Sequence, residues 1–359
     1  STQVSMETTH NSRSLATLDR VVPGMTLVLF IALAFSASLI TPAFEATDER
    51  DHYTYVQYLA LNKTLPVLTL DDPHYEDYQP PVYYVLGVLM TLPARAELLL
   101  PALAETNPFL TSDFDSVNGD NKNVLIHTNA DIFPFSGVAR GLHFARLASV
   151  IVGSVNGIML LRLGRRLFPD AELMPAYIGL TLLVPSYVFS SGVLNNDGAG
   201  ALGGTLVTWY CLKVVDDSDR RSNWFGLAMA MAFATLAKAT TLALAPAVAV
   251  ATILAWHRTA DRRELVGNAL FSGAIWFALT SWWFWRNIVL YGDPLALTRS
   301  WASLGQGNPL PVAWVWRSIP WIWQTYWGRF GAGTVPMPAI IYNGLTVLVV
   351  ASLLGWIWR

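Results

Sequence analysis

Charged residues are scarce in this chain, and so is cysteine. Asp, Glu, Lys and Arg make up 13% of its 359 residues, against about 25% in a soluble globular domain. The net charge of −2 gives no basic surface for a nucleic acid. The one cysteine, Cys211, rules out an intrachain disulfide. A Walker A sequence, a dinucleotide glycine fingerprint and a His-Glu-x-x-His motif are all missing, which argues against nucleotide-driven and zinc-protease chemistry.

Apolar residues, by contrast, make up 53% of the chain, and the mean hydropathy is +0.39. A helix needs about 20 mostly apolar residues to cross a bilayer. By that measure the sequence predicts an all-α, polytopic membrane protein with about eight spans, near 22–42, 143–163, 172–192, 198–215, 223–239, 240–256, 265–284 and 338–358. Lys238, followed by Thr240 and Thr241, requires a very tight turn between two of these spans.

Lysine and arginine in short loops set the expected orientation. With eight spans, the basic residues between them all fall on one side, which is then cytoplasmic; they are Arg13, Arg20, Arg162, Arg165, Arg166, Lys213, Arg220, Arg221, Arg258, Arg262 and Arg263. The prediction is therefore a multi-pass protein with a cytoplasmic N-terminal tail (1–21) and a transmembrane domain (22–358).

Two long segments are expected on the outer side. Residues 43–142 contain two stretches that fit helices lying in the membrane interface, at 49–62 and 82–92. The second is too short to span, since Pro81 and Pro93 bound it. Residues 285–337 are rich in tryptophan, which is typical of a belt at headgroup level.

The first candidate site follows directly on the first span. Asp48, Glu49 and His52 stand there together, and in a helix that begins near residue 47 the side chains of Asp48 and His52 share a face. A carboxylate beside a histidine suits a general base or one half of a metal site. The alternative is that Thr47 or Asp48 caps the helix and Glu49 complements its dipole.

Two further polar clusters lie on the expected outer side. His74, Glu76 and Asp77 could complete a divalent-metal site with His52, although a solvated helix N-terminus explains them equally. Asn195, Asn196 and Asp197 stand between two spans, where an Asx-type turn and an N-cap would also produce this sequence.

Three cations complete the list of candidates. Lys238 is expected deep in or beside the membrane, Arg286 follows a tryptophan-rich run, and Arg329 lies between two glycines. An arginine at a membrane boundary can bind a phosphate bidentately, or it can extend to lipid headgroups.

Five motifs together resemble bacterial integral-membrane glycosyltransferases of the GT-C type. Residues 41–53 (TPAFEATDERDHY) resemble the PPFE-x-x-DEP-x-HF opening of family 39 relatives, the protein O-mannosyltransferases and the lipid A aminoarabinose transferase. The other four motifs follow in chain order: 79–84 (QPPVYY), 194–197 (LNND), 282–287 with 291–294 (WWFWRN and YGDP) and 327–331 (WGRFG).

This resemblance implies transfer of a sugar from a polyprenyl phosphate or pyrophosphate on the extracytoplasmic side of a bacterial inner membrane. By analogy, Asp48 is the base that activates an acceptor hydroxyl, with Glu49 the near alternative. Arg286, Lys238 and Arg329 are the expected donor-phosphate ligands. The residues expected in the substrate pocket are His52, Glu76, Gln79, Tyr83, Asn196 and Asp197. A divalent metal could assist, and the expected partners are the lipid-linked donor and membrane lipids.

Two departures from the family pattern keep other functions open. Arg50 and Asp51 replace the family's proline and small residue, and Arg50 could pair with Asp48 or Glu49 and quench a base. The sequence stops at Arg359, at the end of an apolar run where relatives continue, so a fragment or a reduced member is expected. The alternative is a non-catalytic membrane subunit that works with partner membrane proteins; a secondary transporter, suggested by Lys238 alone, ranks third.

Overall fold

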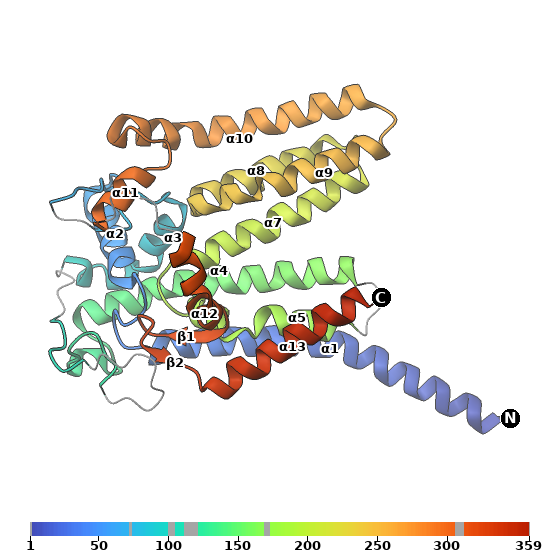
Figure 1. Cartoon of the computed structure of the whole chain (residues 1–359), viewed down its shortest axis with the longest axis horizontal. Helices are drawn as coiled ribbons and strands as arrows, with labels where there is room; N and C mark the ends of the chain where they lie inside the picture. The colour runs from blue at the N-terminus through green and yellow to red at the C-terminus, as the bar shows by residue number, and fades with distance from the viewer. Residues whose placement is uncertain are drawn as a thin grey trace.

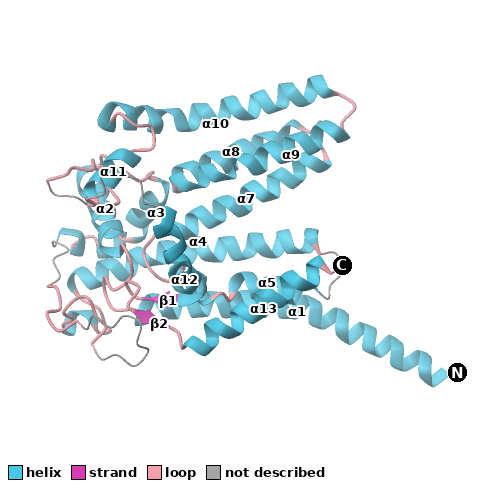
Figure 2. Cartoon of the chain, in the orientation of Figure 1, coloured by secondary structure: helices cyan, strands magenta, loops and turns pink. Residues whose placement is uncertain are grey.

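The structure is a computed structural model that describes residues 2–71, 74–99, 105–110, 121–168, 173–305 and 312–358. It is built from helices (Figures 1 and 2). They are α1 (Thr2–Ile40), α2 (Glu49–Asn62), α3 (Val82–Met90), α4 (Gly137–Leu167), α5 (Met174–Leu182), α6 (Pro185–Ser190), α7 (Asp197–Asp216), α8 (Arg221–Ala237), α9 (Ala245–Arg258), α10 (Arg262–Tyr291), α11 (Leu297–Ser303), α12 (Val312–Gly328) and α13 (Ala339–Ile357). Short 3-10 helices occupy Leu92–Ala94, Glu97–Leu99, Asn129–Asp131 and Ala239–Leu244, and the strands β1 (Arg329–Phe330) and β2 (Val335–Pro336) pair as an antiparallel hairpin.

Five helices in the described part of the chain are long and apolar enough to cross a membrane. They are Val21–Ile40, Gly137–Leu167, Ala239–Arg258, Arg262–Tyr291 and Ala339–Ile357. Each corresponds to one of the expected spans, so the prediction of an all-α membrane protein is confirmed. The expected count of about eight spans is not.

The other three expected spans are not among these five. The stretch 172–192 is divided into α5 and α6, because Pro185 lacks an N–H group and holds Val184 in an extended conformation. The stretches 198–215 and 223–239 correspond to α7 and α8, with 20 and 17 residues. The tight turn expected at Lys238 is present: its backbone is extended (φ −155°, ψ 122°) and it separates α8 from the 3-10 helix Ala239–Leu244.

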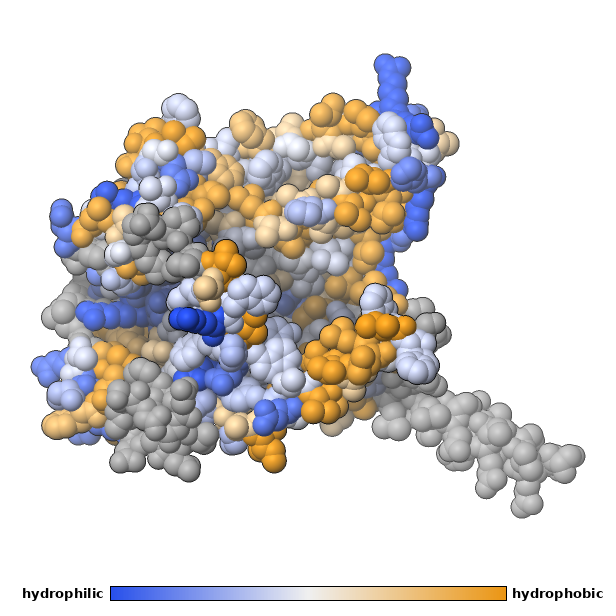
Figure 3. Space-filling view, in the orientation of Figure 1, coloured by the Kyte–Doolittle hydropathy of each residue, from blue (hydrophilic) through white to orange (hydrophobic). Residues whose placement is uncertain are grey.

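The long helices run side by side, with connecting segments at both ends (Figure 1). The N-terminus, the end of α4 and the α9–α10 connection lie at one end. At the other end lie α2, α3, α11, the start of α12 and the β hairpin. Hydrophobic residues dominate the surface of α9, α10 and α13 between these ends (Figure 3). Helices are present, as α2 and α3, at both stretches where the sequence predicts interfacial helices, and the basic loops lie at the opposite end of the molecule.

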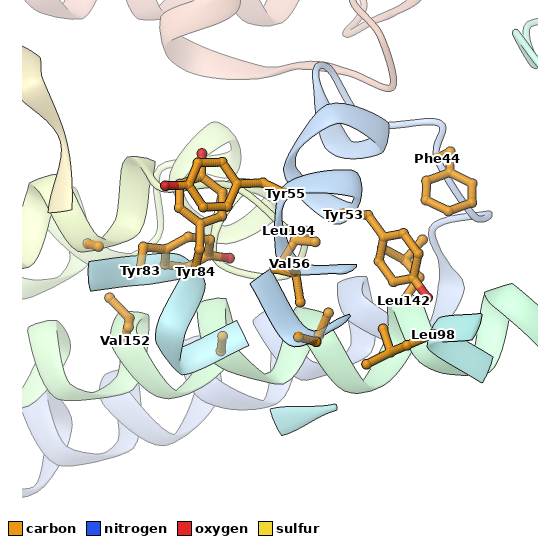
Figure 4. Close-up of a cluster of buried hydrophobic side chains, with 14 of the residues drawn as sticks. Phe44, Tyr53, Tyr55, Val56, Tyr83, Tyr84, Leu98, Leu142, Val152 and Leu194 are labelled. Atoms are coloured by element: carbon orange, nitrogen blue, oxygen red, sulfur yellow. The ribbon is translucent and has the colours of Figure 1, made fainter. Parts of the chain in front are cut away.

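A cluster of buried tyrosines fixes α2 and α3 against α4 (Figure 4). The rings of Tyr55 and Tyr84 stack with centroids 3.7 Å apart, and Tyr83 meets Tyr84 edge to face. Aromatic side chains bury about 150–250 Å² each, so such a cluster dominates local packing. Gly87 lets the two outer helices approach, because a Cβ there would lie 2.7 Å from a methyl group of Val56.

A buried ion pair joins these outer helices to the membrane bundle. Arg146 in α4 and Glu49 in α2 are both fully buried, and their side chains form two hydrogen bonds of 2.8 and 2.7 Å. The remaining donors of Arg146 reach the carbonyl oxygens of Ser38, Thr41 and Pro42 at the end of α1. Glu49 also accepts the backbone N–H groups of Phe44 and Leu194. One pair of side chains therefore connects α1, α2, α4 and the loop before α7.

Replacing Glu49 by Gln is expected to destabilise the fold strongly. The change leaves the buried charge of Arg146 uncompensated, which costs about 3–5 kcal/mol. The matched control is Glu97→Gln, because Glu97 pairs with Arg140, which is 48% exposed, at 3.2 Å; it should cost less than about 1 kcal/mol. Denaturant titration of the detergent-solubilised protein measures both. Equal effects of the two substitutions would contradict the role given to Arg146 and Glu49.

Candidate functional site

A cavity of ≈ 440 Å³ lies at the end of the bundle that carries α2 and the β hairpin. Its walls come from the start of α2, Glu76, α6 with the loop that follows it, Lys238, the last part of α12 and the β hairpin. Segments that are far apart in the sequence thus meet here. Of the predicted site residues, Asp48, His52, Glu76, Asn196, Asp197, Lys238 and Arg329 all line this cavity.

Asp48 has an unusual backbone conformation at the cavity wall. It occupies the N-cap position of α2 in the left-handed region (φ 58°, ψ 3°), and its side chain makes no capping hydrogen bond. Residues with a Cβ rarely adopt this conformation, and when they do they often serve a site. The simple capping role that the sequence allowed is therefore not what the structure shows, and the carboxyl group is turned to the cavity instead.

The surroundings of Asp48 favour a base of moderate strength. Desolvation raises the pKa of its carboxyl group above the usual value, and the charges of Asp51 and Asp197 raise it further, while Lys238 acts in the opposite direction. A carboxylate whose pKa is raised toward the working pH accepts a proton more effectively.

His52 and Glu76 form a buried pair beside Asp48. His52 is buried and its Nδ1 lies 2.8 Å from the Tyr84 hydroxyl. Burial is the largest cause that lowers the pKa of His52, to about 3, so the ring is neutral at physiological pH. Glu76 Oε2 lies 3.8 Å from the same nitrogen and is buried without a hydrogen-bond partner. Burial first, and then the charge of Asp48, raises the pKa of Glu76 to about 7.

The expected four-residue metal site is not assembled. His74 lies 3.7 Å from Asp51 rather than beside His52, and Asp77 does not line the cavity. Among the described residues no group of three or more His, Cys, Asp or Glu side chains could hold a metal ion. The physical reason is that the two histidines belong to different contacts, one buried against Tyr84 and one half-exposed beside Asp51.

The turn before α7 is both an Asx-type turn and part of the cavity wall. The Asn195 side chain accepts the backbone N–H of Asp197 at 2.9 Å, which is the expected Asx-type turn. Asn196 and Asp197 instead face Lys238, whose Nζ lies 3.1 Å from Asn196 Oδ1 and forms an ion pair with the Asp197 carboxylate. Lys238 therefore lies at the cavity with an acidic partner, which explains how a cation is accommodated in an apolar stretch.

Arg329 supplies an oriented cation on the hairpin wall. The residue is 7% exposed, its Nε donates to Gly333 O at 2.7 Å, and its guanidinium lies over the Trp321 ring, 3.8 Å from the centroid. Its Nη1 donates to Gln324 Oε1 at 2.5 Å. Gly331 and Gly333 have positive φ angles of 63° and 80°, a conformation that favours glycine. The tight turn between β1 and β2 thus holds the guanidinium in place.

Several predicted site residues lie outside the cavity. Glu49, the expected alternative base, is committed to Arg146 and does not line it, because helix α2 turns it toward α4. Arg286, expected as a phosphate ligand, does not line the cavity. It donates to the carbonyl oxygen of Pro66 and contacts Asn287. Gln79 and Tyr83 act behind the wall: Gln79 accepts from Asn196 at 3.3 Å, and the Tyr83 hydroxyl accepts the N–H of Asn195 at 3.1 Å.

Arg50 does not quench the base. It is exposed, and no ion pair joins it to Asp48 or Glu49 in the part of the chain that the structure describes. Burial raises the pKa of the neighbouring Asp51, and the charges of His74 and then Arg50 oppose that rise. Sequence reasoning also missed Arg146. A signal existed, since an arginine inside a predicted span is costly unless paired and marks a structural or functional contact.

The pKa of Glu76 predicts how stability depends on pH. Its folded-state pKa lies above its unfolded value, so its stabilising contribution is full below about pH 4.5 and is lost as pH rises through about 7. Relative to Glu76→Gln, which stays neutral, the wild type should lose on the order of 3 kcal/mol between these limits. Unfolding midpoints of both proteins across this range measure the difference. Parallel pH curves would contradict the burial of Glu76.

Part of the chain matches the model of a known protein family. Residues 134–285 match the family model described as dolichyl-phosphate-mannose-protein mannosyltransferase. The match runs from just before α4 into α10, so it includes Arg146, the turn at 195–197 and Lys238. Comparison with curated proteins and with solved structures gives no significant match. The match covers less than half of the chain, and it supports the resemblance to GT-C-type membrane glycosyltransferases seen in the motifs.

Proposed function

We propose that this protein transfers a sugar from a polyprenyl-phosphate-linked donor to an acceptor hydroxyl on the extracytoplasmic side of the membrane. The observation that carries the proposal is the shared cavity: Asp48, the candidate base, lines the same ≈ 440 Å³ space as Arg329 and Lys238. A carboxylate and phosphate-binding cations are the two components that this reaction needs in one place.

The reaction is a single displacement in this proposal. The acceptor oxygen attacks the anomeric carbon of the sugar while its proton passes to the Asp48 carboxylate. The bond between that carbon and the phosphate oxygen breaks, and the phosphate leaves with the electron pair. Attack on the face opposite the leaving group inverts the anomeric configuration. The site lowers the barrier by taking up the proton and by stabilising the charge that develops on the phosphate.

The cations have different roles in this proposal. Lys238 already forms an ion pair with Asp197, so much of its charge is compensated. Arg329 is held by Gly333 and Trp321 at the hairpin wall, and a guanidinium in a fixed orientation can bind phosphate oxygens bidentately. Arg329 is therefore the main ligand for the leaving phosphate, and Lys238 keeps Asn196 and Asp197 in place beside Asp48.

The side of the membrane is inferred from the distribution of charge. The basic loops, which follow α4, α7 and α9, lie at the end of the bundle opposite the cavity (Figure 1). Lysine and arginine concentrate in cytoplasmic loops. The cavity therefore opens on the extracytoplasmic side, where lipid-linked sugars would serve as donors in place of soluble nucleotide sugars.

Asp48→Asn is expected to lower the rate of transfer about 10²–10⁴-fold, the range for loss of a general base. The matched control is Asp51→Asn, one turn further along the same helix, because Asp51 pairs with His74 and does not line the cavity. Activity is measured as release of undecaprenyl phosphate from a panel of undecaprenyl-phosphate sugars in proteoliposomes.

Both variants should keep the thermal stability of the wild type within a few degrees. A fully active Asp48→Asn protein would move the base elsewhere. A wild type that releases nothing from any donor, while remaining folded, would favour a non-catalytic subunit built on this scaffold.

A further inference from the structure

A second cavity adjoins the candidate site at the outer end of α1. This cavity, termed the Ile40 groove, has a volume of ≈ 370 Å³. Its walls come from the last turn of α1 with residues 41 and 42, from Phe189 in α6, from Lys122 and Asn123, and from the β hairpin, including Phe330 and Val335. Most of the lining surface is apolar, and the Phe189 and Phe330 rings meet edge to face with centroids 5.4 Å apart.

The groove and the candidate active site are neighbours in space. Phe189 and Gly331 line both cavities. A ligand that has its phosphate beside Arg329 can therefore extend its apolar part into the groove across the hairpin turn. The shared walls favour a single ligand with one charged end and one hydrocarbon end.

The groove begins where the first candidate span ends. Ile40 is the last residue of the span Val21–Ile40, lines the groove and is 78% exposed. The end of a span lies near the boundary between hydrocarbon and headgroups, so a lipid chain can reach this wall of the groove. The carboxylate of Glu45 also borders the groove, but it accepts hydrogen bonds from the N–H groups of Val124 and Leu125 and contacts His127, so its charge is already solvated by the protein.

A rival apolar cavity exists between α8, α9 and α10. It has a volume of ≈ 260 Å³, and Met231, Gly273 and Trp276 are among its lining residues. It shares no lining residue with the candidate active site. A hydrocarbon chain in that cavity would therefore not be continuous with a phosphate at Arg329.

We infer that the Ile40 groove holds the first part of the isoprenoid chain of the lipid-linked donor, with the phosphate beside Arg329. This inference rests on the proposed function and adds the direction in which the lipid leaves the site, between α1 and the β hairpin. The observations that carry it are the lining shared through Phe189 and Gly331 and the exposed end of the first span, Ile40, in the groove wall.

Substitutions that fill the groove test this inference. Ile40→Trp and Val335→Trp, alone and combined, place an indole in the groove, since both residues line it and both are partly or largely exposed. The matched control is Gly273→Trp, which fills the rival cavity at a glycine where an added Cβ would have no neighbour within 4 Å. The probes are undecaprenyl phosphate and inorganic phosphate, each titrated against the full chain in lipid nanodiscs.

The groove variants should bind undecaprenyl phosphate about tenfold more weakly or worse, the effect of a few CH₂ groups losing their burial. Their affinity for inorganic phosphate should match that of the wild type, which shows that the variants fold and keep the phosphate site. The Gly273→Trp control should bind both probes normally.

Two results would overturn the inference. Normal affinity of the groove variants for undecaprenyl phosphate would mean that the isoprenoid chain does not bind in the groove, which is then a site for ordinary membrane lipid. Weaker binding by Gly273→Trp alone would place the chain in the rival cavity, and the proposed function would still stand. A wild type that binds neither probe would instead reject the proposed function, and the inference with it.

Discussion

The buried ion pair between Arg146 and Glu49 is the contact on which the candidate site depends. Neither side chain is exposed, and every strong donor of the guanidinium has a partner. Through these contacts the end of α1, the start of α2 and the loop before α7 are held at fixed distances from α4. Asp48 is the neighbour of Glu49, and Asn196 follows two residues after Leu194, which donates to Glu49. The ion pair is therefore structural, but it sets the position of two walls of the cavity.

Adjacent carboxylates have opposite environments as a result. The start of α2 turns Glu49 toward α4 and leaves Asp48, in its left-handed conformation, turned to the cavity. Glu49 is fully paired inside the protein, whereas Asp48 has only the more distant charges of Asp51, Asp197 and Lys238 around it. The hairpin then adds Arg329 from a distant part of the chain. An acidic wall and a cationic wall thus come together at the polar end of an apolar bundle, where a ligand with a charged head and a lipid chain can reach both.

The sequence predicts the local structure of this site better than its contacts. The helix at 49–62, the shorter one that begins at 82 and the turn at Lys238 depend on near neighbours, and all three are present. Asp48 and His52 line the same cavity, although Asp48 lies before the helix and not on its face. Which of two adjacent carboxylates faces the cavity depends on Arg146, 97 residues away, and no local pattern shows it. Arg286 and His74 lie outside the cavity for a similar reason, because Arg286 contacts Pro66 and His74 contacts Asp51. The expected number of spans is not confirmed, and apolar composition alone does not show that a helix breaks at Pro185.

The central claim is that a lipid phosphate binds between the hairpin wall and Asp48. The most direct test is a cryo-electron microscopy map of the protein in nanodiscs with undecaprenyl phosphate. We expect phosphate density within hydrogen-bond distance of Arg329, about 2.7–3.2 Å, with the Asp48 carboxylate facing the same cavity. Phosphate density beside Arg286, or a cavity filled by protein side chains with Asp48 paired to Arg50, would contradict it.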